Sequence, residues 1–214
     1  MTDSGSRGIS GGQYPSDCEI TEGLRQRALS RSGQDERGYA WRASLPRAKE
    51  IQLLLLDVDG VLTDGSIVYG NGGTELKGFN IKDGFGIRLL REAGVEVGII
   101  TARRSEAVER RAQDLKLAHL YQGVANKIEA FAEILAAQKL IPQQVAYMGD
   151  DWLDLPLLSR VGLAVTVADG VAEVKAVAHY VTREAGGRGA VRELCELIIE
   201  AKGQREELLA RYLR

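Results

Sequence analysis

The sequence is poor in cysteine, in excess positive charge and in long apolar runs. Its two cysteines, Cys18 and Cys195, argue against a disulfide framework and fit a reducing compartment. The 28 Lys and Arg residues are balanced by 30 Asp and Glu, so nothing indicates a nucleic-acid-binding surface. No apolar run approaches the roughly 20 residues that span a bilayer, and the N-terminus lacks the apolar stretch of a secretory signal. We therefore expect a cytoplasmic protein that binds neither nucleic acid nor membrane.

The pattern of polarity divides the chain into three parts. Residues 1–47 mix polar, charged and small side chains without periodicity, which predicts a flexible N-terminal extension with at most one short helix. Residues 48–203 carry regular apolar patterns and predict one folded domain. Residues 204–214 predict a C-terminal helical extension.

Short apolar runs alternate with helical patterns in the folded domain, which predicts an α/β fold with a parallel sheet flanked by helices. A glycine-rich turn at residues 70–73 lies between two further short strands and predicts a small β-hairpin flap. The strands are expected at residues 51–56, 66–69, 74–80, 95–100, 120–121, 145–148 and 163–167, and the helices at 83–93, 105–115, 127–139 and 190–201.

Polar residues follow the apolar strands at the points where those strands end. In parallel α/β sheets, ligands bind outside the carboxyl ends of the strands, so we expect these side chains to meet. The first strand is followed by Asp57 and Asp59, the second by Thr101, the third by the helix that begins with Lys127, and the fourth by Asp150, Asp151 and Asp154.

This set supplies what the cleavage of a phosphate monoester requires. Asp57 is the candidate nucleophile, and Asp59 is the candidate general acid and base. Asp57, Asp150 and the backbone carbonyl of Asp59 offer the oxygen ligands that Mg²⁺ prefers. Thr101 and Lys127 can bind and neutralise phosphate oxygens. Two further acidic residues, Asp151 and Asp154, are expected to hold waters or to orient Lys127.

Each of these signals also has a simpler interpretation. Asp59-Gly60 is a common turn sequence, and Asp150-Asp151 can cap a helix. A lysine at a helix start is usually a solvated charge. What favours the functional interpretation is the joint occurrence of the set, in this order, at successive strand ends.

The ordered set resembles the haloacid dehalogenase superfamily, whose pattern is DxD, then Ser or Thr, then Lys, then GDDxxD. The resemblance implies a Rossmann-like fold, Mg²⁺ as cofactor and the roles given above. A receiver domain also uses aspartates around magnesium, but it phosphorylates an Asp after the third strand, where this chain has Tyr121-Gln122-Gly123. The gaps from Asp59 to Thr101 and from there to Lys127 are too short for a cap domain, so the chain is similar to the capless class.

Three further stretches resemble the 3-deoxy-D-manno-octulosonate 8-phosphate phosphatases. This resemblance implies hydrolysis of a phosphorylated sugar acid in lipopolysaccharide synthesis. It also implies a homotetramer with shared active sites, with the hairpins at its centre and a tail that reaches a neighbour. The stretches are residues 56–65, 79–84 and 186–193, and the resemblance implies substrate-binding roles for Asp64, Lys82, Arg103 and Arg188.

Two alternatives remain open at this point. Related sequences often have Arg where this chain has Lys82, and lysine lacks the bidentate fork of arginine. The substrate can therefore be a nine-carbon sugar-acid 9-phosphate. The second alternative is a non-catalytic scaffold of the same fold, although such proteins typically lose an aspartate that is present here.

Overall fold

A six-stranded parallel sheet forms the centre of the molecule. The computed structural model describes residues 17–30 and 38–213. The strand order is β5-β4-β1-β6-β7-β8, and a separate antiparallel pair, β2 and β3, forms the hairpin. Both features confirm the predicted fold class. The strands are β1 Leu53–Leu56, β2 Val68–Tyr69, β3 Glu75–Leu76, β4 Glu96–Thr101, β5 His119–Gln122, β6 Val145–Met148, β7 Leu163–Thr166 and β8 Tyr180–Val181.

Strand β1 lies between β4 and β6, and all four of its leucines are fully buried. The last of them, Leu56, pairs with Ile99 of β4 and with Met148 of β6. This register brings the carboxyl ends of the three strands to one edge of the sheet. The residues that directly follow β4 and β6 therefore lie close to Asp57, which directly follows β1.

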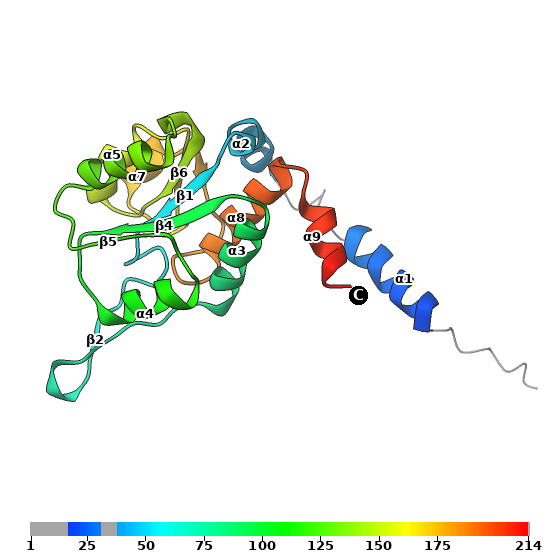
Figure 1. Cartoon of the computed structure of the whole chain (residues 1–214), viewed down its shortest axis with the longest axis horizontal. Helices are drawn as coiled ribbons and strands as arrows, with labels where there is room; N and C mark the ends of the chain where they lie inside the picture. Colours follow the sequence, from blue (N-terminus) through cyan, green and yellow to red (C-terminus); the bar gives the residue numbers. More distant parts are fainter. Residues whose placement is uncertain (1–16, 31–37, 214) are drawn as a thin grey trace, which may run out of the picture.

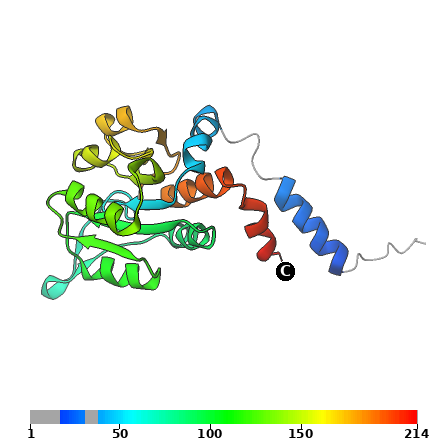
Figure 2. The ribbon, with the colours of Figure 1, turned by 45° about the horizontal axis from the view of Figure 1, so that its top comes forward.

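Helices cover both faces of the sheet, as Figures 1 and 2 show. The side chains of Leu54 and Leu56 enter one apolar core, whereas Leu53 and Leu55 enter the other, as the two-residue period of a strand requires. The first core is covered by α2 Tyr39–Lys49, α3 Ile81–Glu92, α4 Glu106–Asp114 and α8 Ala190–Ala201, and the second by α5 Lys127–Gln138, α6 Leu155–Leu158 and α7 Ala172–Val177.

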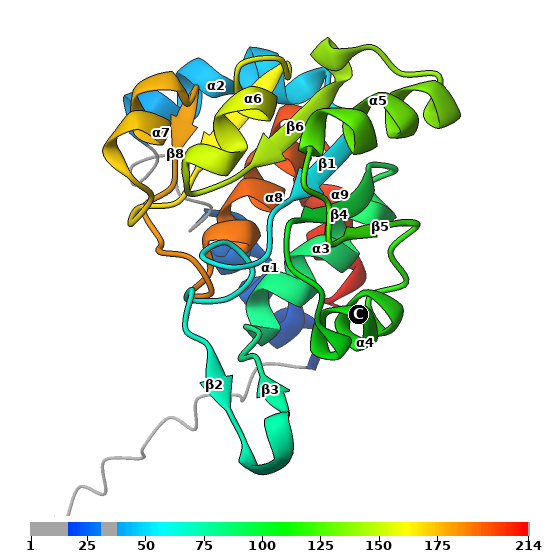
Figure 3. The same cartoon turned by 90° about the vertical axis from the view of Figure 1, so that its left-hand side faces the viewer.

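The described chain has no cap domain. Only the hairpin and α3 lie between β1 and β4, and only α4 and β5 lie between β4 and α5. The hairpin extends away from the body of the molecule, as seen best in Figure 3. The site at the strand ends is therefore left without a lid from its own chain.

The structure differs from the sequence prediction before residue 48. Helix α2 begins at Tyr39 and places Trp41, which is 5% exposed, in the core. The Trp41 indole donates a hydrogen bond to Glu200 (3.1 Å) and meets the ring of Tyr180 edge-on. Pro46 inside this helix hides the helical pattern from sequence analysis.

The two ends of the chain carry one further helix each. These are α1 Asp17–Ser30 and α9 Arg205–Arg211. Within the flexible extension predicted for residues 1–47, residues 1–16 and 31–37 lie outside the described residues. None of the helices that the structure describes is long and apolar enough to cross a membrane.

Candidate active site

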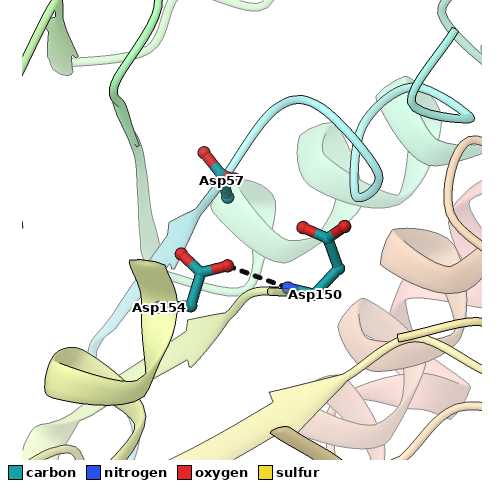
Figure 4. A group of neighbouring side chains, drawn as sticks. All are labelled: Asp57, Asp150 and Asp154. Atoms are coloured by element: carbon teal, nitrogen blue, oxygen red, sulfur yellow. Dashed lines mark hydrogen bonds between the residues drawn. The ribbon is translucent and has the colours of Figure 1, made fainter. Parts of the chain in front are cut away.

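Three carboxylates converge at the carboxyl edge of the sheet. Asp57 directly follows β1, while Asp150 and Asp154 follow β6 (Figure 4). One oxygen from each of the three lies within 4.8 Å of the others. Such a cluster is typical of a site for a hard divalent cation.

Asp154 is the hub of this cluster. Its Oδ1 accepts hydrogen bonds from Lys127 Nζ (2.7 Å) and from the Tyr147 hydroxyl (2.5 Å). Its Oδ2 accepts from the backbone amides of Asp150 (2.9 Å) and Asp151 (3.2 Å). Because both oxygens are engaged, Asp154 positions the lysine and the loop, which leaves Asp57 and Asp150 as the candidate metal-binding carboxylates.

Lys127 is a buried cation next to the candidate nucleophile. It is the first residue of α5, whose start is capped by the side chain of Asn126 accepting from Ile128 N. Its Nζ lies 3.0 Å from Asp57 Oδ1. Burial acts to lower the pKa of Lys127, but Asp57 and Asp154 outweigh it and raise that pKa above its usual value. The ammonium group therefore stays charged beside the carboxylates.

The carboxylates carry more negative charge than one lysine can offset. Burial raises the pKa of Asp57 to about 6, although Lys127 opposes the rise. Burial, followed by the charges of Asp154 and Asp57, raises the pKa of Asp150 to about 7. An oxygen-lined site with this excess of negative charge fits Mg²⁺.

Without metal, the stability of the protein should fall as the pH rises. The folded-state pKa values of Asp57 and Asp150 lie above the ordinary value of 3.8. Their protonation therefore stabilises the fold below about pH 4, and this contribution is lost as the pH passes about 6 and about 7. We expect the free energy of unfolding in chelator to fall by several kcal/mol across this range. Denaturant titrations with chelator and with Mg²⁺ measure it.

Asp150→Asn is the matched control, since it removes one of the two charges without changing the size of the side chain. In chelator this variant should lose much of the pH dependence and unfold less readily than the wild type near pH 8. Added Mg²⁺ should stabilise the wild type far more than the variant. An equal response of the two proteins to Mg²⁺ would contradict the assignment of Asp150 as a ligand.

Thr101 and Asp59 complete the edge of the site. Thr101 is the buried last residue of β4, next to β1 in the sheet. The Asp59 carboxylate contacts Lys77 Nζ and lies 3.5 Å from Arg103 Nε. Glu75 lies 3.2 Å from Lys77 and 2.8 Å from Arg103. Opposite charges thus alternate around the candidate acid and base, and they tie the hairpin to it.

Comparison with known proteins decides the family. The model of the haloacid dehalogenase-like hydrolases matches residues 116–194. The chain is 50% identical over 163 residues to 3-deoxy-D-manno-octulosonate 8-phosphate phosphatase KdsC of Escherichia coli K12, covering 76% of this chain and 87% of that protein. The chain belongs to the 3-deoxy-D-manno-octulosonate 8-phosphate phosphatase family.

Solved structures of the family share the fold. The phosphatase from Yersinia pestis superposes with a TM-score of 0.75 at 51% identity, covering 77% of this chain and 89% of that one. The phosphatase from Moraxella catarrhalis, solved with magnesium, phosphate and KDO, gives a TM-score of 0.77 at 39% identity, covering 78% of this chain and 97% of that one. A magnesium ion in a family member agrees with the donor set found here.

The substrate-binding residues expected from the family fall into separate groups. Arg188 forms an ion pair with Asp64 at 3.0 Å, and both side chains are well exposed. Arg103 lies on Asp59 and Glu75, as described above. Lys82 is exposed on the first turn of α3. Three of the four residues thus have an ion-pair partner among themselves or at the candidate acid and base, namely Asp64, Arg103 and Arg188.

The glycine-rich segment of this family member packs on its own chain. Gly187 N donates to Val61 O (2.9 Å), and a Cβ added to Gly186 would lie 1.8 Å from Gly60 O. Gly60 in turn has a positive φ of 83°, and a Cβ there would lie 2.0 Å from an Asp150 oxygen. The segment therefore rests on the loop that connects the candidate acid and base to the metal site.

Sequence reasoning missed three buried polar residues that support the site. Lys77 contacts Asp59. It lies two residues after Glu75 in the hairpin, and the two-residue period of a strand places both side chains on one face, which is the sequence signal that could have indicated it. Asp83 accepts a hydrogen bond from Arg192 N (2.7 Å) and so holds the start of α8 after the glycine-rich segment. Burial raises the pKa of Asp83. Tyr147 lies within an apolar strand pattern, which gives no sign of its hydrogen bonds.

Asp151, the second acidic residue after β6, has a local role. The side chain of Asp151 accepts a hydrogen bond from Trp152 N (2.7 Å) and caps the short 3₁₀ helix Trp152–Asp154. This is the capping arrangement that the sequence also allowed. Among the described residues, Lys127 forms its polar contacts with Asp57, Tyr147 and Asp154 instead, so a role of Asp151 in holding water stays a prediction.

Proposed function

We propose that this protein hydrolyses 3-deoxy-D-manno-octulosonate 8-phosphate to the free sugar acid and inorganic phosphate. The observation that carries the proposal is the position of Asp57, at the open end of β1, 3.0 Å from the Lys127 ammonium and within the carboxylate cluster. The 50% identity with KdsC of Escherichia coli supports the substrate. The product would enter lipopolysaccharide synthesis.

The reaction divides into two displacements at phosphorus. In the first, an Asp57 oxygen bonds to phosphorus while the bond to the sugar oxygen breaks, and Asp59 gives its proton to that oxygen. In the second, Asp59 takes a proton from water, the water oxygen bonds to phosphorus, and the bond to Asp57 breaks. Phosphate leaves, and both aspartates return to their starting states.

The remaining residues lower the cost of bringing two anions together. Lys127 and Thr101 would hold the phosphoryl oxygens at the nucleophile. Mg²⁺, when bound by Asp57, Asp150 and the carbonyl of Asp59, supplies the positive charge that offsets repulsion between carboxylate and phosphate. Asp154 keeps Lys127 and the Asp150 loop in place through the contacts described above.

Phosphate release from 3-deoxy-D-manno-octulosonate 8-phosphate, with Mg²⁺ and with chelator, tests the proposal. We expect selective, magnesium-dependent turnover of this ester over a nine-carbon sugar-acid 9-phosphate and a panel of sugar phosphates. Faster turnover of the nine-carbon ester would assign the other substrate. In that case Lys82→Arg is the variant to compare, because arginine restores the bidentate fork at that position.

We propose that the hairpin mediates a homotetramer with shared active sites. Support comes from exposed apolar side chains on a two-stranded sheet, which is too small to be stable unaided. Light scattering of the whole protein gives the subunit number. The exposed apolar residues of the hairpin are Ile67, Val68, Tyr69 and Leu76.

We further propose that the enzyme works in the cytoplasm. Both cysteines are free, as expected in a reducing compartment. A fusion to a fluorescent protein, followed by fractionation, tests the location.

A further inference from the structure

Tyr147 is a fully buried tyrosine beneath the active site that the proposed mechanism does not use. It lies in the middle of β6, three residues before Asp150, and its ring packs in the core covered by α5 and α6. Burial, and then the charge of Asp154, raises the pKa of its hydroxyl well above the usual value. The hydroxyl therefore keeps its proton and has one donor and its lone pairs to place.

The hydroxyl joins the two side chains that carry charge next to the nucleophile. It donates to Asp154 Oδ1 at 2.5 Å and accepts from Lys127 Nζ at 3.0 Å. Lys127 also donates to the same Asp154 oxygen at 2.7 Å. The three groups thus form a closed triangle with every side at hydrogen-bonding distance.

The triangle restrains the ammonium group from one side. Because its sides are 2.5, 2.7 and 3.0 Å, Asp154 Oδ1 and the Tyr147 hydroxyl lie in nearly the same direction from Lys127 Nζ. The same nitrogen lies 3.0 Å from Asp57 Oδ1. A phosphoryl oxygen must be held close to Asp57 during attack.

We infer that Tyr147 is a positioning residue that aims the Lys127 ammonium at the transferring phosphoryl group through its hydrogen bonds to Lys127 and Asp154. The inference rests on the proposed roles of Asp57 and Lys127. Without the hydroxyl, the ammonium group keeps its charge and its contact with Asp154 but loses one of the two hydrogen bonds that hold it in place. We expect this loss to destabilise the transition state more than the bound substrate, because the negative charge on the phosphoryl oxygens that Lys127 stabilises is greatest in the transition state.

Tyr147→Phe tests this with little change in volume. We expect kcat to fall about ten- to hundredfold, the range expected when a hydrogen bond to a charged group is removed. KM should change by less than about threefold, and inhibition by orthovanadate should weaken by the same factor as kcat. p-Nitrophenyl phosphate serves as the substrate, so this test does not depend on which sugar acid is the natural substrate. A wrong sugar-acid assignment shows in the assay with 3-deoxy-D-manno-octulosonate 8-phosphate. A wrong role for Tyr147 shows in the ratio of the variant's kcat to that of the wild type.

Two comparisons separate positioning from a structural role. Tyr180→Phe removes another buried hydroxyl, which donates to Glu193 at 2.5 Å, and should leave kcat unchanged. In a Lys127→Met background, Tyr147→Phe should cause no further loss of kcat, because its effect passes through the lysine. An unchanged kcat in Tyr147→Phe, an equal loss in Tyr180→Phe, or an additive loss in the double variant would overturn the inference.

Discussion

Asp57→Asn is expected to lower phosphate release by about 10⁴-fold or more while the fold is kept. The amide has the size of the carboxylate but cannot form the phosphoryl bond, and it removes one anionic oxygen ligand from the metal site. The measurement is single-turnover phosphate release with saturating Mg²⁺. Trapping of radiolabelled phosphate on the protein should succeed for the wild type and fail for the variant.

The matched control is Asp114→Asn, at the exposed end of α4, which should retain full activity. Unfolding of Asp57→Asn in chelator should require more denaturant than that of the wild type, because one buried charge of the cluster is gone. A variant that is folded and still releases phosphate at more than about 1% of the wild-type rate would refute Asp57 as the nucleophile. A wild-type protein without any turnover would instead favour a scaffold.

Lys127→Met should reduce turnover by roughly 10³-fold, because a preorganised buried cation next to the transferring group is lost. Lys127 is also what lowers the raised pKa of Asp57. Without it, the carboxylates hold protons more tightly, and Mg²⁺ must displace them. We therefore expect both a lower kcat and a higher Mg²⁺ concentration for half-maximal activity, measured by metal titration of initial rates.

Lys49→Met, at the exposed end of α2, controls for the loss of a positive charge and should leave both quantities unchanged. The variant needs a check by near-ultraviolet circular dichroism, because Asp154 loses a buried partner. A folded Lys127→Met protein with wild-type kcat and metal dependence would show that the lysine has no part in the chemistry.

Local signals were enough to predict five of the six strands of the sheet and the flanking helices α3, α4, α5 and α8, but not β8, α6 or α7. The apolar run before Asp57 is β1, the glycine turn is the hairpin, and residues 145–148 are β6 as predicted. Each of these follows from side-chain periodicity or turn chemistry, which a short window of sequence contains. The grouping of the site residues could be predicted for the same reason. Ligands bind at the carboxyl ends of parallel strands, so the positions of the strands are enough to indicate which residues meet there.

Contacts between distant segments could not be predicted in this way. Trp41 reaches Glu200, and Lys77 reaches Asp59, through pairings that depend on the finished packing of helix and hairpin. Tyr147 reads as one more apolar strand residue, because the sequence does not show what lies opposite its hydroxyl. Helix α2 was missed because an internal proline argues against a helix unless tertiary contacts hold it.

The central place of β1 has a consequence for how the protein is made. This strand leaves the ribosome before its partners β4 and β6, which follow about 40 and about 90 residues later in the chain. Pairing between segments so far apart in the sequence slows folding. Until then a run of four leucines has no neighbours on either edge, which exposes it to chaperones and to other nascent chains. Since the proposed nucleophile is the next residue, the proposed catalytic centre cannot form before β4 and β6 have been made. Synthesis must pass β6 before the first phosphate can be cleaved.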